Sequence, residues 1–171
     1  MSYFKNIFTT GAISKTPGRV LKRITNEVPL SDPKLIIELG AGKGEITRNV
    51  INKLGSSLSR YIAFEIHKDF AEELKIKFPG IDVLEEDALN FDQLTDQKAD
   101  LIICSLPLSF FPKQDRKTFL EKIKNNTKTG GKAIILFHAF WLLPEFKEVF
   151  RDYKLIKIFN LPPYYIITYT S

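Results

Sequence analysis

The sequence has few of the features that mark secreted or membrane-spanning proteins. Cys104 is the single cysteine in 171 residues, so no disulfide can form within the chain and nothing argues for an oxidising compartment. The longest apolar run, AIILFHAFWLL at 133–143, is interrupted by His138 and is too short to span a bilayer. The N-terminal stretch MSYFKNIF lacks the apolar core of a signal peptide. We therefore expect a cytoplasmic protein that can also lie at the periphery of a membrane.

The chain also lacks internal repeats, low-complexity tracts and any linker rich in Pro, Gly or Ser. This absence favours one domain over residues 1–171. Hydrophobic residues make up 44% and charged residues 26%, which is an ordinary globular composition. The net charge of +5 favours anionic partners, such as nucleic acid or an anionic lipid surface, without choosing between them. The sequence gives no indication of the oligomeric state.

What the sequence does contain is a regular alternation of strand and helix patterns. This alternation predicts parallel βαβ units with right-handed crossovers. The last two strands leave no room for a helix between them, so we expect an antiparallel hairpin at one edge. Strands are predicted at 34–39, 61–66, 81–86, 99–106, 131–139, 154–160 and 164–170, and helices at 45–54, 68–78, 113–126 and 144–153.

Residues 1–28 form an N-terminal helical segment ahead of this pattern. Its second part, 16–28, is predicted as a helix that starts at Pro17 and carries apolar residues on one face and basic residues on the other. Its first part, 2–8, carries a short aromatic stripe. An aromatic stripe before a basic helix is typical of an interfacial membrane anchor, and packing on the sheet is the alternative interpretation. The apolar positions are Tyr3, Phe4, Ile7, Phe8, Val20, Leu21, Ile24 and Val28.

The stretch IIELGAGKGEIT at 36–47 joins the first strand to the next helix through a glycine-rich turn. It does not match the phosphate-binding pattern G-x-x-x-x-G-K-[ST] or the dinucleotide pattern G-x-G-x-x-G. Glu38 and Glu45 flank the turn, and these acids would repel a pyrophosphate at the helix N-terminus. A plain tight turn is the remaining alternative. The pattern thus favours a ligand that is cationic and carries no phosphate.

The turn fits E-x-G-x-G-x-G at Glu38, Gly40, Gly42 and Gly44, and so resembles motif I of class I S-adenosylmethionine-dependent methyltransferases. This resemblance implies a Rossmann-like, mostly parallel seven-stranded α/β sheet with helices on both faces, and S-adenosylmethionine as cofactor. An acid after the second strand can accept both ribose hydroxyls. The cofactor-binding residues carried by the resemblance are Glu38, Gly40, Gly42, Gly44, Glu65, Ile66, Asp87, Ala88 and Ser105, with TGGK at 129–132 as the turn before the fifth strand. No metal site is implied.

The loop after the fourth strand, SLPLSFFP at 105–112, should frame the methyl acceptor. Enzymes that methylate an adenine amino group carry N-L-P-Y or a close variant there, and this chain instead has Ser105, Leu106, Pro107 and Leu108. The loss of the aromatic residue argues against a stacked base. The loop, GAISKT at 11–16 and NLPPYYIITY at 160–169 are similar to bacterial phospholipid N-methyltransferases, which implies N-methylation of a phosphatidylethanolamine-like head group. A further similarity, to rRNA adenine dimethylases, keeps RNA adenine N6-methylation as an alternative.

The candidate catalytic residues are Ser105, Leu106, Pro107, His138 and Tyr165. His138 is a candidate base and Tyr165, with Tyr164, a candidate cation–π partner for an ammonium group. Core packing of the histidine and edge-strand packing of the tyrosines are the alternatives. Since no general base is certain from the sequence, a cofactor-binding, membrane-peripheral module without turnover also stays open. The aromatic residues Phe110, Phe111, Phe140 and Trp141 fall on two loops at the same predicted edge and could meet a membrane, acyl chains or one another.

Overall fold

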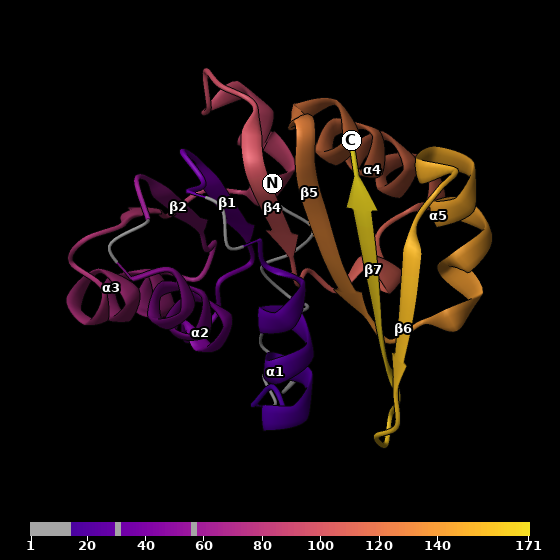
Figure 1. The fold of residues 1–171 in the computed structure, drawn as a ribbon, viewed down its shortest axis with the longest axis horizontal. Helices are drawn as coiled ribbons and strands as arrows, with labels where there is room; N and C mark the ends of the chain where they lie inside the picture. The colour runs from indigo at the N-terminus through magenta and orange to yellow at the C-terminus, as the bar shows by residue number, and fades with distance from the viewer. Residues whose placement is uncertain (1–14, 30–31, 56–57) are drawn as a thin grey trace.

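The protein is an α/β domain around one twisted sheet of seven strands (Figure 1). The structure, a computed structural model, describes residues 15–29, 32–55 and 58–171. The strand order across the sheet is β3-β2-β1-β4-β5-β7-β6. The strands are β1 Ile36–Leu39, β2 Tyr61–Phe64, β3 Asp82–Leu84, β4 Ala99–Cys104, β5 Thr127–Phe137, β6 Lys154–Ile158 and β7 Tyr164–Thr170.

The sheet is parallel except for β7. Strands β1 to β5 pair in parallel, whereas β7 pairs antiparallel with both β5 and β6. Strand β6 therefore runs in the same direction as β1 to β5. The predicted terminal hairpin is confirmed, and the structure adds that β7 enters the sheet between β5 and β6. As a result the turn between β6 and β7 lies at the carboxyl edge, where β1 to β5 also end.

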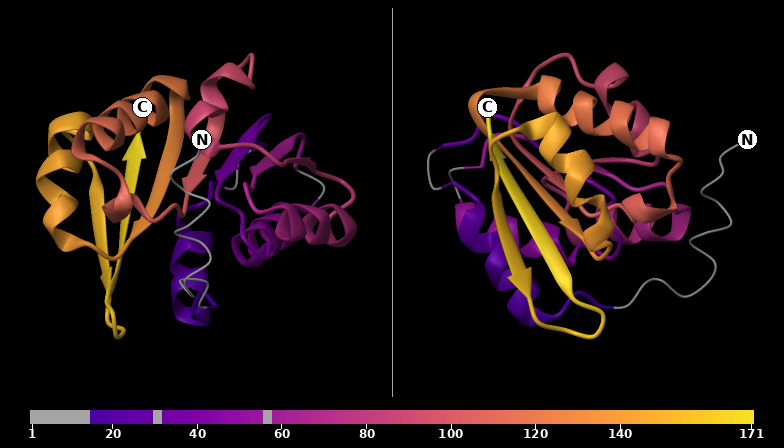
Figure 2. Two further views of the ribbon diagram at one scale, coloured as in Figure 1. Left: turned by 180° about the vertical axis from the view of Figure 1, so that it is seen from behind. Right: turned by 90° about the vertical axis from the view of Figure 1, so that its right-hand side faces the viewer.

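Helices cover both faces of the sheet, as the resemblance implied (Figures 1 and 2). One core contains the buried side chains of α1, α2 and α3, and the other contains those of α4 and α5. Alternate residues of a strand serve opposite cores: Ile36 belongs to the first and Ile37 to the second. The helices are α1 Gly18–Glu27, α2 Glu45–Leu54, α3 Lys68–Lys77, α4 Lys113–Asn126 and α5 Leu143–Phe150.

Helix α1 packs on the domain through its apolar face, where Val20, Ile24 and Val28 are buried. Its last carbonyls are capped from α2, because Lys53 Nζ donates to the carbonyl oxygens of Thr25 and Val28, each at 2.6 Å. The packing interpretation of residues 16–28 thus holds for this face of the helix. The aromatic stripe at 2–8 lies outside the described residues. Among the described ranges, no helix combines the length and apolarity that a bilayer crossing requires.

Most predicted boundaries shift by one or more residues, and three of these differences bear on the sequence reasoning. Pro17 immediately precedes α1 and caps it, instead of being its first residue. The TGGK segment at 129–132, expected as a turn, lies inside β5, where the register against β4 shifts between Ala99 and Leu101. Helix α5 ends at Phe150 and not at 153, because Arg151 has a φ of 56° that a right-handed helix cannot continue.

Candidate functional site

The ends of β1 to β4 surround a small hollow at the carboxyl edge of the sheet. Ligands of open α/β sheets bind at this edge. The sequence predicts six of its eight lining residues as part of the site: Gly40, Glu65, Ile66, Asp87, Ala88 and Leu106. Phe64 and Phe111 complete the wall. The other predicted cofactor ligands, Glu38, Gly42, Gly44 and Ser105, lie outside that wall.

The glycines of the loop after β1 make room mainly for the protein itself. All three adopt positive φ, at 83°, 55° and 80° for Gly40, Gly42 and Gly44. A Cβ on Gly40 would lie 2.7 Å from Cδ2 of Leu106 in the loop after β4. A Cβ on Gly44 would lie 2.5 Å from a ring atom of Phe78. Only at Gly42 would a Cβ meet nothing within 4 Å, so only there does the loop leave space.

Glu65 joins the loops that follow β1 and β2. Its Oε2 accepts a hydrogen bond from the Gly42 amide at 2.7 Å, and its Oε1 accepts one from the His67 amide at 2.8 Å. The side chain is buried yet lines the hollow. Each carboxylate oxygen can accept more than one hydrogen bond. Glu65 therefore holds the glycine loop and still offers acceptors for two hydroxyl groups of a ligand.

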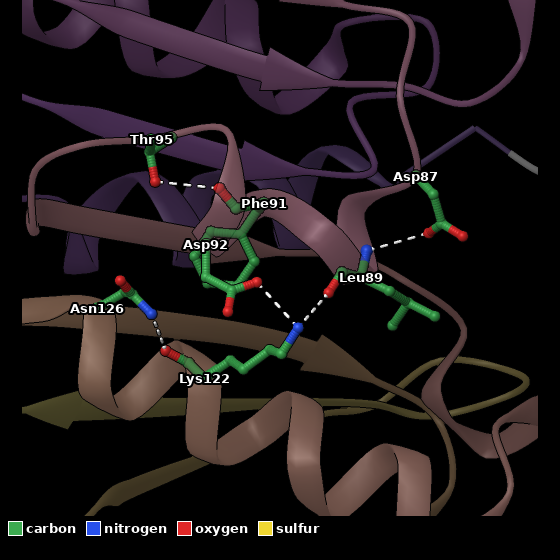
Figure 3. Close-up of polar contacts among 7 residues, drawn as sticks. All are labelled: Asp87, Leu89, Phe91, Asp92, Thr95, Lys122 and Asn126. Atoms are coloured by element: carbon green, nitrogen blue, oxygen red, sulfur yellow. Dashed lines mark hydrogen bonds and ion pairs between the residues drawn. The ribbon is translucent and has the colours of Figure 1, made fainter.

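Asp87 caps the 3-10 helix Ala88–Gln93 after β3. Its Oδ1 accepts from the Leu89 amide at 3.0 Å, as Figure 3 shows. This turn is anchored to α4, because Lys122 Nζ donates to the Leu89 carbonyl and pairs with Asp92, both at 2.9 Å (Figure 3). The cap uses one carboxylate oxygen of Asp87 and leaves the other for a donor in the hollow.

Glu38 is fully buried on the α2 side of the sheet. Its Oε2 accepts from the hydroxyl groups of Thr47 and Tyr61, both at 2.6 Å. Oε1 is buried without a hydrogen-bond partner in the structure. Burial raises the pKa of Glu38 to about 7, against the lowering effect of the two hydroxyl donors. Glu38 thus fastens the first turn of α2 to β1 and β2.

The loop after β4 is tied to the glycine loop. Ser105 Oγ donates to the Gly40 carbonyl oxygen at 2.7 Å, and the Leu106 side chain packs over the open Cα of Gly40. Leu108 is buried in the core. Cys104 is buried at the end of β4, and burial raises the pKa of its thiol to about 12, so the thiol stays neutral near neutral pH.

A buried ion pair holds the rest of this loop. Arg116 of α4 binds Glu145 of α5 in a bidentate pair, with Nε–Oε2 at 2.6 Å and Nη2–Oε1 at 2.7 Å. Its Nη1 donates to the carbonyl oxygens of Leu108 and Phe111, at 3.2 and 2.7 Å. The guanidinium therefore fixes the backbone of the loop after β4 (residues 105–112, the predicted acceptor loop) against α4 and α5.

His138 and Tyr165 lie farther along the same edge, after β5 and at the start of β7. His138 is exposed, and its Nδ1 lies 2.8 Å from the Pro163 carbonyl oxygen. A carbonyl only accepts, so Nδ1 carries the proton and Nε2 of the neutral ring is an acceptor. Tyr165 is buried against Phe137, with ring centroids 5.4 Å apart. The Lys157 ammonium lies 6.0 Å from its ring centroid, so a cation of the protein already makes the cation–π contact predicted for Tyr165.

The aromatic residues of the two loops divide into buried and exposed members. Phe111 is buried and packs on Phe119, whereas Phe110, Phe140 and Trp141 are exposed.

Sequence reasoning misses Phe64, which lines the hollow. It also misses a set of residues that hold the surrounding segments without lining the hollow: Thr47, Tyr61, Arg116, Glu145 and Lys122. Their partners are distant in sequence, so no local pattern signals them. One signal was available in the sequence: Arg116 is a charged residue at a core-facing position of α4, and such a residue indicates a buried polar partner.

Comparisons with known proteins agree with this geometry. The methyltransferase domain family matches residues 36–131. The ornithine lipid N-methyltransferase of Singulisphaera acidiphila is 25% identical, covering 94% of this chain and 88% of that protein. The ribosomal RNA small subunit methyltransferase A of Thermotoga petrophila is 28% identical, over 58% of this chain and 37% of that protein.

Among solved structures, the N-methyltransferase NodS of Bradyrhizobium japonicum, in complex with S-adenosyl-L-homocysteine, has a TM-score of 0.69 at 14% identity. The match covers 92% of each chain, and it shows that the fold is shared. The family match spans more than half of the chain and includes the glycine loop, the hollow and the loop after β4. The chain therefore belongs to the S-adenosylmethionine-dependent methyltransferases.

Proposed function

We propose that this enzyme methylates the head-group amine of a membrane lipid of the phosphatidylethanolamine kind. The observation that carries the proposal is the loop after β4. Where a base-methylating enzyme presents an aromatic ring, this chain has Leu108, and its side chain is buried in the core. Position 108 therefore offers no ring for stacking, an interaction worth about 1–3 kcal/mol per base. The similarity along most of the chain to a protein named for N-methylation of a lipid supports the same choice.

The donors and acceptors around the hollow fit the cofactor. Glu65 and Asp87 provide carboxylate oxygens for hydroxyl and amino groups, and Ile66, Ala88 and Leu106 provide apolar walls for a flat ring. S-adenosylmethionine supplies a methyl group on a cationic sulfur, so the chemistry is the cofactor's and the protein contributes position and orientation. The carboxylates of Glu65 and Asp87, which line the hollow, suit a cation better than a phosphate.

The protein must also manage a proton. A primary amine titrates near 10.4, so it arrives mostly protonated and has to lose a proton before it attacks. Nε2 of His138 is the group we assign to accept it, because Nδ1 is held by the Pro163 carbonyl. Ser105 Oγ, whose own proton goes to Gly40, can accept an N–H of the amine and orient it. Leu106 and Pro107 keep water from the reacting side of the loop.

RNA adenine methylation is the second candidate. The similarity to a ribosomal RNA methyltransferase and the net charge of +5 favour it. The chain spans about a third of that relative, so the relative's activity is a weaker guide than that of the lipid enzyme.

Thin-layer chromatography of lipids tests the proposal. The protein is incubated with S-adenosylmethionine labelled on the methyl group and with phosphatidylethanolamine. We expect label in mono- or dimethylated lipid, and loss of most of this label in His138→Gln, with S-adenosylhomocysteine binding retained. Label in RNA with none in lipid would contradict the proposal and favour the second candidate.

A further inference from the structure

The carboxyl edge of the sheet has two halves of opposite character. Around β2 and β3 the exit segments are acidic, with Glu65, Asp69, Glu85, Glu86 and Asp87. Beyond β4 the character changes, because no Asp or Glu occurs in residues 105–114, 138–143 or 157–163. These three segments follow β4, β5 and β6, strands that run in the same direction. The loops after β4, β5 and β6 therefore carry no carboxylate. The next acids along the chain lie in the first turns of α4 and α5, where Asp115 is exposed and Glu145 is paired with Arg116.

Large apolar side chains are exposed on this second half. Phe110 follows β4, Phe140 and Trp141 follow β5, and Phe159 and Leu161 form the turn after β6. Phe159 is 79% exposed, Leu161 96% and Trp141 64%. The loops after β5 and β6 touch, since His138 Nδ1 lies 2.8 Å from the Pro163 carbonyl oxygen. Within the loop after β5, the rings of Phe140 and Trp141 lie 5.8 Å apart. Clustered apolar exposure of this kind marks an interaction site.

The turn between β6 and β7 projects farthest. In Figure 1 it extends beyond the ends of the other strands, and the side view of Figure 2 shows the same projection. Two cations flank it. Lys157 Nζ lies 5.4 Å from the Phe159 ring centroid, and Arg19 of α1 donates to Asn160 Oδ1 at 3.0 Å. An apolar tip with cations at its base matches an interface of acyl chains below anionic head groups.

We infer that the turn Phe159–Leu161, together with Phe140 and Trp141, inserts into an anionic phospholipid bilayer and seats the acceptor loop on its surface. The inference deepens the proposed lipid acceptor and rests on it in part. Charge selects this occupant: loops with exposed cations and no carboxylates are attracted to an anionic leaflet. A second copy of the chain would bring the same positive charge to the contact.

Trp141 makes the test direct, because it is the single tryptophan of the chain. Its fluorescence is recorded without S-adenosylmethionine, on vesicles of phosphatidylcholine mixed with phosphatidylglycerol and on phosphatidylcholine alone. We expect a blue shift on the mixed vesicles, quenching by brominated phosphatidylcholine, and loss of binding as salt is raised. An unchanged Trp141 spectrum on anionic vesicles would overturn the inference, and this readout needs no variant.

The variant Phe159→Ser/Leu161→Ser removes the tip. Both side chains are exposed, so circular dichroism should remain that of the wild type. We expect the affinity for vesicles to fall about tenfold or more, because burying one large apolar side chain in the bilayer changes the affinity by at least about that factor. Ile76→Ser is the matched control: Ile76 is 82% exposed but lies on α3, away from this edge, and its loss should leave binding unchanged. Equal binding by the tip variant and the control would overturn the inference, as would a dimer in sedimentation that the tip variant abolishes.

The outcomes separate this inference from the proposed function. Methyl transfer to a short-chain, monomeric phosphatidylethanolamine tests the chemistry without a membrane. Vesicle binding without any lipid methylation would support the docking surface and contradict the proposed function. Methylation of the monomeric lipid by a protein that does not bind anionic vesicles would contradict the docking surface alone.

Discussion

Ser105 Oγ donates a hydrogen bond of 2.7 Å to the carbonyl oxygen of Gly40, and this contact joins the loop after β4 to the glycine loop after β1. The two residues are 65 positions apart, yet they follow neighbouring strands, β1 and β4. A substitution in one loop should therefore change the position of the other loop.

Ser105→Ala should uncouple the loops. The lost hydrogen bond costs about 1 kcal/mol of folding stability, and a positioning loss of that size lowers the rate of methyl transfer by about fivefold. Ser109→Ala, an exposed serine in the same loop, serves as control and should change neither quantity. Denaturation in urea and single-turnover transfer measure the two effects. Equal rates for the two variants would show that the contact has no part in positioning.

Gly40→Ala should destabilise the fold more than Gly42→Ala. Both alanines are forced into a left-handed backbone, at about 1–2 kcal/mol. Only at position 40 does the new Cβ also meet Leu106, at 2.7 Å, and such overpacking adds about 1–3 kcal/mol. The difference should appear in the free energy of unfolding.

A double-mutant cycle assigns that difference to Leu106. In the Gly40→Ala background, Leu106→Ala should restore most of the overpacking loss, giving a favourable coupling energy. Purely additive effects would mean that the backbone of Gly40, and not the space above it, sets the cost.

Arg116→Met should lower the stability of the fold by removing the side chain that holds the acceptor loop to α4 and α5. The change leaves the carboxylate of Glu145 and two loop carbonyls without their buried donor, and breaking one side of a buried ion pair costs about 3–5 kcal/mol. The neighbouring Lys117→Met breaks an exposed pair with Glu148 and should cost less than about 1 kcal/mol. Thermal or urea denaturation compares them. Similar losses in both variants would contradict the role assigned to Arg116.

Glu38→Gln should change how stability depends on pH. Burial raises the pKa of Glu38 from 4.5 to about 7, so the native state holds this proton more tightly than the unfolded chain. Its contribution to stability is complete below pH 4.5 and is lost as the pH rises through about 7. The variant has no such proton, so its stability relative to wild type should rise between pH 4.5 and 8 by about 3 kcal/mol.

Urea denaturation at the two pH values gives this difference, and the other carboxylates cancel because both proteins share them. Glu148→Gln is the control, since Lys117 lowers the pKa of Glu148 and its contribution changes only in more acidic solution. A difference between wild type and Glu38→Gln that stays constant with pH would show that Glu38 is not a buried acid.

Much of the fold could be predicted from residue patterns. Helix α2 runs from Glu45 to Leu54 as expected, because Gly44 and Gly55 bound it on both sides. The hollow could also be predicted, since the ends of parallel strands meet at one edge and carry Gly40, Glu65 and Asp87 there.

The orientation of single side chains could not be predicted in this way. Strand β1 is buried on both faces, so alternation gives no hint that Glu38 points towards Thr47 and away from the hollow. Phe110 and Phe111 are equivalent in sequence, and only the turn Leu108–Phe110 exposes one and buries the other. Arg116 and Glu145 lie 29 residues apart, and only the packing of α4 on α5 pairs them.

One measurement shows most directly whether the methyl group goes to a lipid amine. A crude cell extract is incubated with the protein and methyl-labelled S-adenosylmethionine, then separated into lipid, RNA and protein, with His138→Gln as the reference. We predict that the label above this reference enters the lipid fraction and migrates with N-methylated phosphatidylethanolamine. Label confined to RNA or protein would contradict methylation of a lipid amine.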